Sequence, residues 1–281
     1  MKILVTGAAG MVGRATVQNA LSRGHVVLAT IHGALDIADA QAVDRFLDRE
    51  RPEAVINCAA FIDVDGSESR PEVAFAVNAH GPENLARACA ANGGRLVTIS
   101  TDYVFDGKKE GFYTQNDAVG PQGVYARAKV RGEQLARAAC PRTTIVRSGW
   151  IFGAQGKNFL SQVLDKARRG EPLKAIHDAY GTPTYGPDLA QRLVDFAERG
   201  LAGIYHVVNA GGGTSYAGFT QAALQAAGLS AQSVELVAQG SLERPAPRPR
   251  NSRLACVASD KAGLSPLPHW TVALARFAKL P

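Results

Sequence analysis

A turn with three regularly spaced glycines constrains the fold of this chain more than any other feature. Gly7, Gly10 and Gly13 follow the apolar segment 2–6 and precede a segment of helical composition that runs to about Arg23. In a turn of this kind the first glycine permits the bend, the second lets the backbone approach a pyrophosphate, and the third allows helix and strand to pack closely. The N-terminus of a helix also favours anions. The segment therefore predicts dinucleotide binding rather than a simple tight turn.

Strand-like and helix-like segments alternate through the first half of the chain. Apolar segments at 26–31, 53–57, 96–99 and 143–147 are separated by helical segments at 39–51, 71–92 and 125–140. This alternation predicts an α/β fold with a doubly wound, parallel Rossmann sheet. After Gly153, glycine- and proline-rich stretches separate shorter elements. We therefore expect a dinucleotide-binding Rossmann domain at 1–150, with returns from later segments, and a smaller lobe at 151–281 that mainly binds substrate.

The segment between Ser100 and Lys129 carries side chains suited to carbonyl reduction. Thr101 follows an apolar strand, and Tyr125 and Lys129 lie four residues apart in a helical segment, which places them on one face. A cation beside a phenol lowers its pKa, but a decrease of ~3 units needs roughly 4 kcal/mol, so a cationic nicotinamide and a water-poor cleft would have to assist Lys129. Tyr125 could then protonate a carbonyl oxygen while hydride reaches the carbon, and Thr101 would donate a hydrogen bond to the same oxygen. In isolation, a Tyr-x-x-x-Lys spacing is more often an ordinary exposed helical pair.

The end of the second apolar segment bears on the choice between NADH and NADPH. A carboxylate usually ends this strand in sites that select NAD. Here Thr30 and His32 occupy that region, and Asp36 is the first carboxylate after them. This favours NADPH slightly over NADH, with Arg14 or His32 as partners for a 2′-phosphate. Asp36 could border the adenine, or Asp36 and Asp39 could only cap the next helix.

Composition and charge narrow the class of partner. The net charge of +6 and the pI near 9.2 suit an anionic ligand such as a nucleotide diphosphate. We expect no nucleic acid, because no long run of Lys and Arg carries interleaved aromatic residues. We expect no membrane span and no signal peptide, because no apolar segment approaches ~18 residues and the N-terminus enters a strand at once. The basic, proline-rich segment 244–253 is either a linker or an ordered arm that contacts phosphates.

The four cysteines and Trp150 lead to two further expectations. Cys58, Cys89, Cys140 and Cys256 are far apart and form no Cys-x-x-Cys pair. Buried free thiols in a reducing cytoplasm are therefore expected. Trp150 lies at the end of the last strand of the first half, where it could belong to the core or pack against a sugar ring.

A set of short motifs, taken together, resembles one known family. The motifs span nearly the whole chain: Gly7-x-x-Gly10-x-x-Gly13, Leu35-Asp36-Ile37, Val55-Ile56-Asn57-Cys58-Ala59-Ala60, Tyr125-x-x-x-Lys129, Arg147-Ser148-x-Trp150, Gly156-x-Asn158-Phe159, Gly181-x-Pro183-Thr184 and Arg248-Pro249-x-Asn251-Ser252-x-Leu254. The run Ser100-Thr101-Asp102-Tyr103-Val104-Phe105-Asp106-Gly107 is close to a signature. With these motifs the chain resembles the extended short-chain dehydrogenase/reductases, and within them the dTDP-4-dehydrorhamnose reductase family.

The resemblance implies roles for particular residues. It implies Tyr125 as proton donor, Lys129 as the anchor of the nicotinamide ribose, and Thr101 as the group that polarises the carbonyl. It implies cofactor contacts at Gly7, Gly10, Met11, Val12, Gly13, Asp36, Ile37, Ala60, Phe61 and Ile62, as well as at Tyr125 and Lys129. It places a dTDP-linked 4-keto deoxysugar near Thr101, Asp102, Tyr103 and Trp150. The implied reaction is the NAD(P)H-dependent reduction of the 4-keto group of dTDP-4-dehydro-L-rhamnose to dTDP-L-rhamnose.

Two segments on the substrate side depart from the family pattern. These are Val64-Asp65-Gly66-Ser67-Glu68 and Asp178-Ala179-Tyr180-Gly181. The sugar could therefore be another 4-keto sugar nucleotide, which the protein would reduce or epimerise. Some relatives bind magnesium between subunits through a glutamate, where this chain has Arg14-Ala15, so no metal is expected.

A third interpretation is a protein without catalytic activity. The β subunit of methionine adenosyltransferase resembles this family, and the chain could likewise be an NADP-binding regulatory subunit. The retained Tyr125, Lys129 and Thr101 argue against this interpretation. The expected assembly is a monomer or a homodimer.

Overall fold

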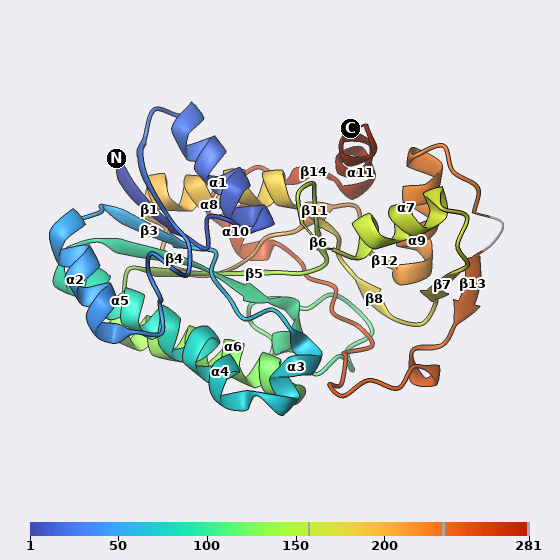
Figure 1. Cartoon of the computed structure of the whole chain (residues 1–281), viewed down its shortest axis with the longest axis horizontal. Coiled ribbons are helices and arrows are strands. Elements are labelled where there is room, and N and C mark those ends of the chain that lie inside the picture. Colours follow the sequence, from blue (N-terminus) through green and yellow to red (C-terminus); the bar gives the residue numbers. More distant parts are fainter. Residues whose placement is uncertain (157, 232–233, 280–281) are drawn as a thin grey trace.

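Six parallel strands form the central sheet of the computed structural model, which describes residues 1–156, 158–231 and 234–279 (Figure 1). They are β1 (Lys2–Thr6), β2 (Val26–Thr30), β3 (Ala54–Asn57), β4 (Arg95–Thr101), β5 (Thr143–Ser148) and β10 (Gly203–His206), in the order β10-β5-β4-β3-β1-β2. The chain reverses its direction of progress at β1, which has β2 on one side and β3 on the other. Ligands bind at such a switch point, outside the carboxyl ends of the strands. The predicted α/β class with a parallel Rossmann sheet is confirmed.

Helices cover both faces of the sheet. Helix α1 (Met11–Ser22) packs against α8 (Gly186–Arg199) on one face, and α10 (Val257–Lys261) contacts β10. On the other face lie α2 (Ala40–Glu50), α5 (Gly81–Ala91) and α6 (Gly123–Ala139), as Figure 1 shows. Each face has its own apolar core, one centred on Ile3, Val5 and Leu193 and the other on Leu4, Val55 and Leu85.

Helix α2 shows how local sequence sets an element. The Asp39 carboxylate accepts a hydrogen bond from the backbone N–H of Ala42 at 3.0 Å, which satisfies a first-turn donor. Arg51 ends the helix with a φ of 46°, and Pro52 follows. Of the alternatives for the two aspartates, Asp39 is therefore the helix cap.

The segment before β4 differs from the single helix predicted at 71–92. Helix α3 (Val64–Ser69) precedes α4 (Pro71–Phe75), and a π-helical turn at Ala76–His80 separates α4 from α5. The π turn carries Asn78, whose Oδ1 accepts from the Phe61 N–H at 3.0 Å and whose Nδ2 donates to the Phe61 carbonyl at 2.8 Å. A π turn inserts one residue into a helix and is frequent near functional sites, which periodicity alone does not predict.

The later part of the chain builds a second lobe beside the sheet. Its helices are α7 (Phe159–Arg168), α9 (Tyr216–Ala226) and α11 (Trp270–Ala278), which share a core of Phe152, Leu160, Phe219 and Phe277. Short strand pairs complete it: β6 (Ile151–Phe152) with β9 (Thr184–Tyr185), β7 (Leu173–Ile176) with β13 (Val234–Val237), β8 (Tyr180–Gly181) with β12 (Thr214–Ser215), and β11 (Asn209–Ala210) with β14 (Leu267–His269). Two short 3₁₀ turns occur at Asp102–Val104 and Gln239–Ser241.

An ordered segment at 242–254, which we call the strap, joins the two parts of the molecule. Arg248 forms an ion pair with Asp65 of α3 at 2.9 Å. The Asn251 side chain donates to the carbonyls of Lys109 and Gly111. Because the strap is fixed at several points, the linker interpretation of 244–253 is wrong, and the segment is an ordered arm.

Three general expectations can be compared with the fold. All four cysteines are free thiols; Cys89 and Cys140 are buried, and Cys58 and Cys256 are half-buried. Within the described ranges, no helix combines the length and apolarity needed to cross a membrane. Nor do those ranges bring together three or more His, Cys, Asp or Glu side chains in a way that could hold a metal ion.

Candidate active site

A cleft of about 880 Å³ opens at the carboxyl ends of β1, β3 and β4. It extends from the glycine turn to the aromatic side chains of the second lobe. Every residue for which the family resemblance implied contact with cofactor or substrate lines this cleft: Gly7, Gly10, Met11, Val12, Gly13, Asp36, Ile37, Ala60, Phe61, Ile62, Thr101, Asp102, Tyr103, Tyr125, Lys129 and Trp150. Segments more than a hundred residues apart in sequence thus meet in one cleft.

The glycine turn leaves room for an anion at the start of α1. Gly7 has a φ of 64°, and a Cβ on it would lie 2.6 Å from the backbone nitrogen of Ala59 at the end of β3. A Cβ on Gly13 would overlap the carbonyl oxygen of Gly7. Gly10 is the N-cap of α1 and makes no side-chain cap, so the first-turn N–H groups face the cleft without a side-chain acceptor from that residue. These features fit a pyrophosphate group.

The end of the cleft where the adenosine was expected contains His32, Asp36 and Ile37. Ile37 is buried against Gly81, whereas His32 is exposed and lies 3.7 Å from the Asp36 carboxylate, Nδ1 to Oδ1. Asp36 Oδ1 also accepts from the Ala38 N–H at 2.9 Å. Arg14 instead donates to the carbonyl of Gln155 and does not line the cleft within the described residues. Of the two predicted partners for a 2′-phosphate, His32 is in place and Arg14 is not.

Tyr125 and Thr101 meet in the middle of the cleft. The side chains of Tyr125 and Thr101 both line the cleft and lie close enough for Thr101 to affect the pKa of the phenol, while Thr101 Oγ1 donates its hydrogen bond to Asp102 Oδ1 at 3.1 Å. Burial raises the pKa of Tyr125 well above its usual value, and the nearby Asp102 and Tyr103 raise it further, against the lowering effect of Thr101. Without a cofactor the pKa of Tyr125 is therefore not lowered, and the expectation that Lys129, a cationic nicotinamide and a water-poor cleft lower it together stays a prediction.

Lys129 faces the sheet rather than solvent. Its ammonium donates to the carbonyl oxygen of Ile99 at 2.7 Å, and the side chain is buried. Burial lowers the pKa of Lys129 to about 8, although the negative charge of Glu133 raises it. The interpretation of Tyr125 and Lys129 as an ordinary exposed helical pair is excluded by this burial.

A buried ion pair fixes α6 to the sheet behind Lys129. Glu133 receives three hydrogen bonds from Arg147 of β5, with a shortest distance of 2.6 Å, and both side chains are less than a tenth exposed. Ser100 Oγ donates to the same carboxylate at 2.5 Å. This network joins α6 to β4 and β5 and so holds the face that carries Tyr125 against the strand end that carries Thr101.

Asp102 is buried within the cleft wall. Its Oδ2 atom has no hydrogen-bond partner among the described residues. Burial raises the pKa of Asp102 to about 6, against the lowering effects of hydrogen bonds from Ser252 and Thr101. A Cβ on Gly149 would lie 2.5 Å from Asp102 Oδ2. The Asp102 carboxyl group therefore fits in its position only because residue 149 has no side chain. The unpaired oxygen marks a place where a ligand hydroxyl could bind.

An aromatic wall closes the other end of the cleft, where the sugar was expected. The Trp150 ring stacks on Tyr216 with centroids 3.8 Å apart, and Phe159 packs edge-on to Tyr216 at 4.9 Å. Trp150 both lines the cleft and packs on the core of the second lobe, so it belongs to the core, and its packing against a sugar ring stays a prediction. Asn158 and Phe159 were among the family motifs. No sequence signal identified Tyr216, which belongs to α9 and contacts Trp150, a residue far from it in the sequence.

The comparisons with known proteins agree with this geometry. The family model described as "RmlD substrate binding domain" matches residues 1–280. The dTDP-4-dehydrorhamnose reductase of Mycobacterium tuberculosis is 41% identical over 280 residues, which cover 98% of this chain and 91% of that protein. The chain belongs to the RmlD substrate binding domain family.

Solved structures of similar proteins extend the match to the fold of this RmlD-family chain. The dTDP-4-dehydrorhamnose reductase of Clostridium acetobutylicum has a TM-score of 0.95 and 34% identity, with 99% of this chain and 98% of that chain covered. A Bacillus anthracis dTDP-4-dehydrorhamnose reductase, solved in complex with NADP, has a TM-score of 0.95, 29% identity and 98% coverage of both chains. The predicted family, the fold and the class of enzyme, an NAD(P)H-dependent oxidoreductase, are confirmed.

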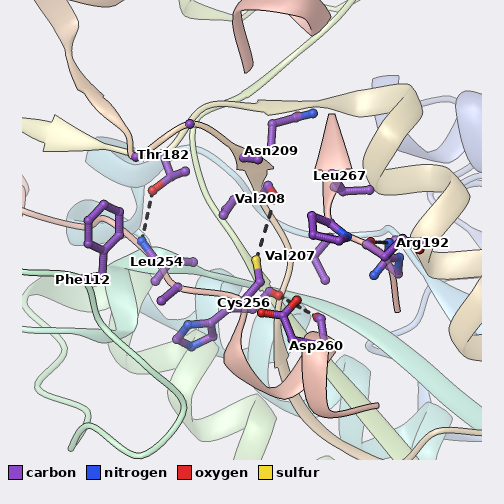
Figure 2. Close-up of a pocket in the computed structure, with 18 residues that line it drawn as sticks. Phe112, Thr182, Arg192, Val207, Val208, Asn209, Leu254, Cys256, Asp260 and Leu267 are labelled. Carbon is purple, nitrogen blue, oxygen red and sulfur yellow. Dashed lines mark hydrogen bonds between the residues drawn. The ribbon is translucent and has the colours of Figure 1, made fainter. Parts of the chain in front are cut away.

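A second cavity, of about 330 Å³, lies apart from the predicted residues of the RmlD-family site (Figure 2). Its walls come from β11, the end of the strap and the segment that follows. Several polar groups on its walls have protein partners: Leu254 N–H donates to Thr182 Oγ1, Arg192 donates to the Ser265 carbonyl, and the Cys256 thiol faces the Val208 carbonyl. The larger cleft is therefore the candidate active site.

Proposed function

We propose that this RmlD-family protein reduces the 4-keto group of dTDP-4-dehydro-L-rhamnose to give dTDP-L-rhamnose, with Tyr125 as the proton donor. The observation that carries the proposal is a single cleft that contains both the glycine turn and the neighbouring side chains of Tyr125 and Thr101. Hydride transfer needs the cofactor and the sugar in such a shared space, because the reacting atoms must come within contact distance. The similarity to reductases named for this substrate supports the choice of sugar.

The residues of the cleft fit a nicotinamide dinucleotide. The glycine turn and the start of α1 would hold the pyrophosphate, Asp36 and Ile37 would border the adenosine, and Ala60, Phe61 and Ile62 would line the path between them. Lys129 would anchor the ribose next to the nicotinamide. Bound NAD(P)H supplies the hydride, and the NADP complex of the similar Bacillus anthracis protein supports NADPH as the preferred form.

The state of Tyr125 suits a proton donor in the direction of reduction. Its raised pKa keeps the phenol protonated at neutral pH, so the proton is present when negative charge develops on the carbonyl oxygen. An alkoxide is a stronger base than a phenolate, so the transfer is favourable. Thr101 donates a hydrogen bond to the same oxygen and stabilises the charge as it forms. Lys129, one helical turn away and with a pKa of about 8, then stabilises the phenolate that remains.

The substrate end combines aromatic and polar groups. We propose that Trp150 packs against the sugar, and that Asp102 and Tyr103 bind its hydroxyl groups. Burial raises the pKa of Tyr216, and the charges of Arg244 and Arg248 on the strap oppose this rise, so their positive charge reaches the cleft and would attract the diphosphate. In this proposal the second lobe and the strap form the binding surface for the dTDP-sugar.

A second candidate is a reductase or epimerase of another 4-keto sugar nucleotide. Residues that differ from the family pattern lie close to this end of the site. Helix α3 contains Gly66 and Ser67, and its first residue Val64 lines the cleft. Tyr180, after the altered Ala179, contacts the strap through Arg253. These contacts permit a different sugar without any change at Tyr125.

The test is NADPH oxidation by the purified protein with dTDP-4-dehydro-L-rhamnose and with a panel of other dTDP-linked 4-keto deoxysugars. We expect turnover of the first substrate with the highest kcat/KM. Tyr125→Phe should lower kcat by about 10²-fold or more, because it removes the proton donor, while NADPH binding measured by fluorescence should persist. Turnover of another sugar alone would select the second candidate, and no turnover of any sugar would contradict both.

The cysteines bear on where the reaction takes place. We propose a cytoplasmic enzyme, because all four cysteines carry free thiols, as is usual in reducing compartments. Protein prepared without reductant and then unfolded should therefore show four reactive thiols in a thiol titration. A lower count, restored by a reductant, would contradict this proposal.

A further inference from the structure

The first turn of α6 is capped by a residue from another helix. Gln122 is the N-cap of α6 but makes no side-chain cap. The backbone N–H of Val124 instead donates to the Glu68 carboxylate of α3 at 2.7 Å. Free N–H groups at a helix start need an acceptor, and a carboxylate there also interacts favourably with the helix dipole. Tyr125 is the next residue along the chain.

The contact between Glu68 and α6 depends on a glycine. Gly123 begins α6 with a φ of 77°, a conformation that other residues rarely adopt. A Cβ at this position would lie 2.7 Å from Glu68 Oε1 and 3.2 Å from Pro247 of the strap. The absence of a side chain therefore lets α3 and the strap approach the backbone two residues before Tyr125.

Helix α3 is itself held by the strap. Asp65 forms two hydrogen bonds with the Arg248 guanidinium, at 3.0 and 2.9 Å, and its Oδ1 also accepts from the Ala246 N–H at 3.1 Å. Three segments thus meet at the start of α6. One turn beyond Tyr125, Lys129 binds the Ile99 carbonyl of β4. The helix is therefore fixed on both sides of Tyr125, by Glu68 before it and by Lys129 after it.

We propose that Glu68 is a positioning residue for the reduction, because it fixes the first turn of α6 and so directs the Tyr125 phenol toward Thr101. The proposal rests on the proposed function. A proton donor must lie within hydrogen-bond reach of the carbonyl oxygen, and a misplacement of about 1 Å can cost up to 10²-fold in rate. Glu68 touches neither Tyr125 nor the proposed reacting atoms in the contacts of the described structure, so its effect passes through the backbone.

The test compares four substitutions in the full-length protein. Glu68→Ala removes the acceptor, Glu68→Asp keeps the charge on a side chain shorter by one methylene, and Glu68→Gln keeps an oxygen that can accept from Val124. Glu72→Ala is the matched control, since this exposed carboxylate lies in the first turn of the next helix. The measurements are hydrogen exchange of the Val124 amide without substrate, the dissociation constant of NADPH, and kcat and KM with the keto sugar.

We expect Glu68→Ala and Glu68→Asp to exchange the Val124 amide several-fold faster and to lose about tenfold in kcat, with NADPH binding nearly unchanged. Glu68→Gln should restore most of kcat, and Glu72→Ala should match the wild type. Faster exchange with unchanged kcat would overturn the proposal and leave Glu68 as a structural cap, and unchanged exchange would overturn the contact itself. If the wild type reduces no keto sugar, the proposed function fails, and the positioning role for reduction fails with it, whereas an exchange effect would still show that the contact is real.

Discussion

The ammonium of Lys129 lies one helical turn from Tyr125 but donates its hydrogen bond to the carbonyl oxygen of Ile99, 2.7 Å away. The charged end of Lys129 thus lies in a buried position, and this burial lowers the pKa of Lys129 to about 8. A group with this pKa is mainly charged at neutral pH and mainly neutral at pH 9. The protonation state of Lys129 therefore bears on three parts of the molecule: α6, which carries the residue, β4, which accepts its hydrogen bond, and the proposed cofactor site.

We predict that NADPH binding weakens as the pH rises through about 8. Above that value Lys129 loses its proton, so the logarithm of the dissociation constant should rise toward a slope of about one per pH unit, if binding uses the charged form. Fluorescence titration between pH 6 and 10 measures this. Lys129→Met should bind NADPH weakly at every pH in that range. A wild-type affinity that stays constant to pH 10 would contradict the proposed role of Lys129.

We predict that Asp102→Asn stabilises the protein relative to the wild type as the pH rises. Burial raises the pKa of Asp102 from 3.8 to about 6, so the folded state binds this proton more tightly than the unfolded state. The wild type should therefore lose about 3 kcal/mol relative to the variant between about pH 4 and pH 6. Urea unfolding at several pH values measures the difference.

A second aspartate provides a control of opposite sign for that experiment. Hydrogen bonds from Lys109 and Thr114 hold the pKa of Asp117 down at about 2. Its carboxylate therefore stabilises the folded state above pH 4, and this stability is lost as the pH falls toward 2. Asp117→Asn should be less stable than the wild type near neutral pH. Equal pH profiles for the two variants would refute the assignment at Asp102.

We predict that Gly149→Ala impairs use of the sugar substrate. The new methyl group would lie within 3 Å of the Asp102 carboxylate and force it out of place. Overpacking of this kind costs about 1–3 kcal/mol, and the displaced carboxyl group should also raise KM for the sugar. Gly111→Ala is the matched control, because a Cβ at Gly111 meets no atom within 4 Å. Steady-state kinetics and thermal unfolding of Gly149→Ala and Gly111→Ala measure the difference. Equal KM values for the sugar in the two variants would show that Asp102 does not bind the sugar.

We predict that Glu133→Ala strongly destabilises the fold. The substitution leaves the Arg147 guanidinium buried without its partner, which costs about 3–5 kcal/mol in comparable pairs. The exposed pair of Arg87 and Asp44 offers a control, since Arg87→Ala should change stability by less than about 1 kcal/mol. Urea unfolding of both variants measures the contrast. A cost at Glu133 as small as that at Arg87 would mean that the buried pair does not hold α6 to the sheet.

We predict that His32→Asp shifts the cofactor preference toward NADH. His32 lines the adenosine end of the cleft, where it can meet a 2′-phosphate, and a second carboxylate beside Asp36 would repel that group. The ratio of kcat/KM for NADPH to that for NADH should fall by about tenfold, which corresponds to 1.4 kcal/mol. Arg14→Ala should leave the ratio unchanged, because Arg14 binds Gln155 outside the cleft. An equal shift in both variants would place the 2′-phosphate elsewhere.

Local patterns predicted the parts of the molecule that local forces determine. The strand, glycine turn and helix at the N-terminus follow from residues that adjoin in sequence, and so does the capping role of Asp39. Most cleft residues were implied by the resemblance to the family, and sheet geometry supports them because the carboxyl ends of parallel strands meet at one edge. Thr101 and the glycine turn are examples.

Features that depend on distant contacts were not predictable in this way. Tyr216 reaches Trp150 from α9, and Glu68 reaches Val124 from α3, although no spacing in the sequence joins these pairs. The pKa of Tyr125 is another example, because burial raises it and burial is a property of the whole fold that the spacing of Tyr125 and Lys129 does not reveal.

The pairing of β10 with β5 has a consequence for how the molecule can be made. The strand that completes the sheet ends at residue 206, and α8, which packs on α1, directly precedes it. During synthesis, the chain must therefore emerge from the ribosome to about residue 206 before all six strands of the central sheet can pair. Until then β5 remains an unpaired edge, the kind of surface on which chaperones act and aggregates begin. Any truncation near residue 150 would make that transient state permanent.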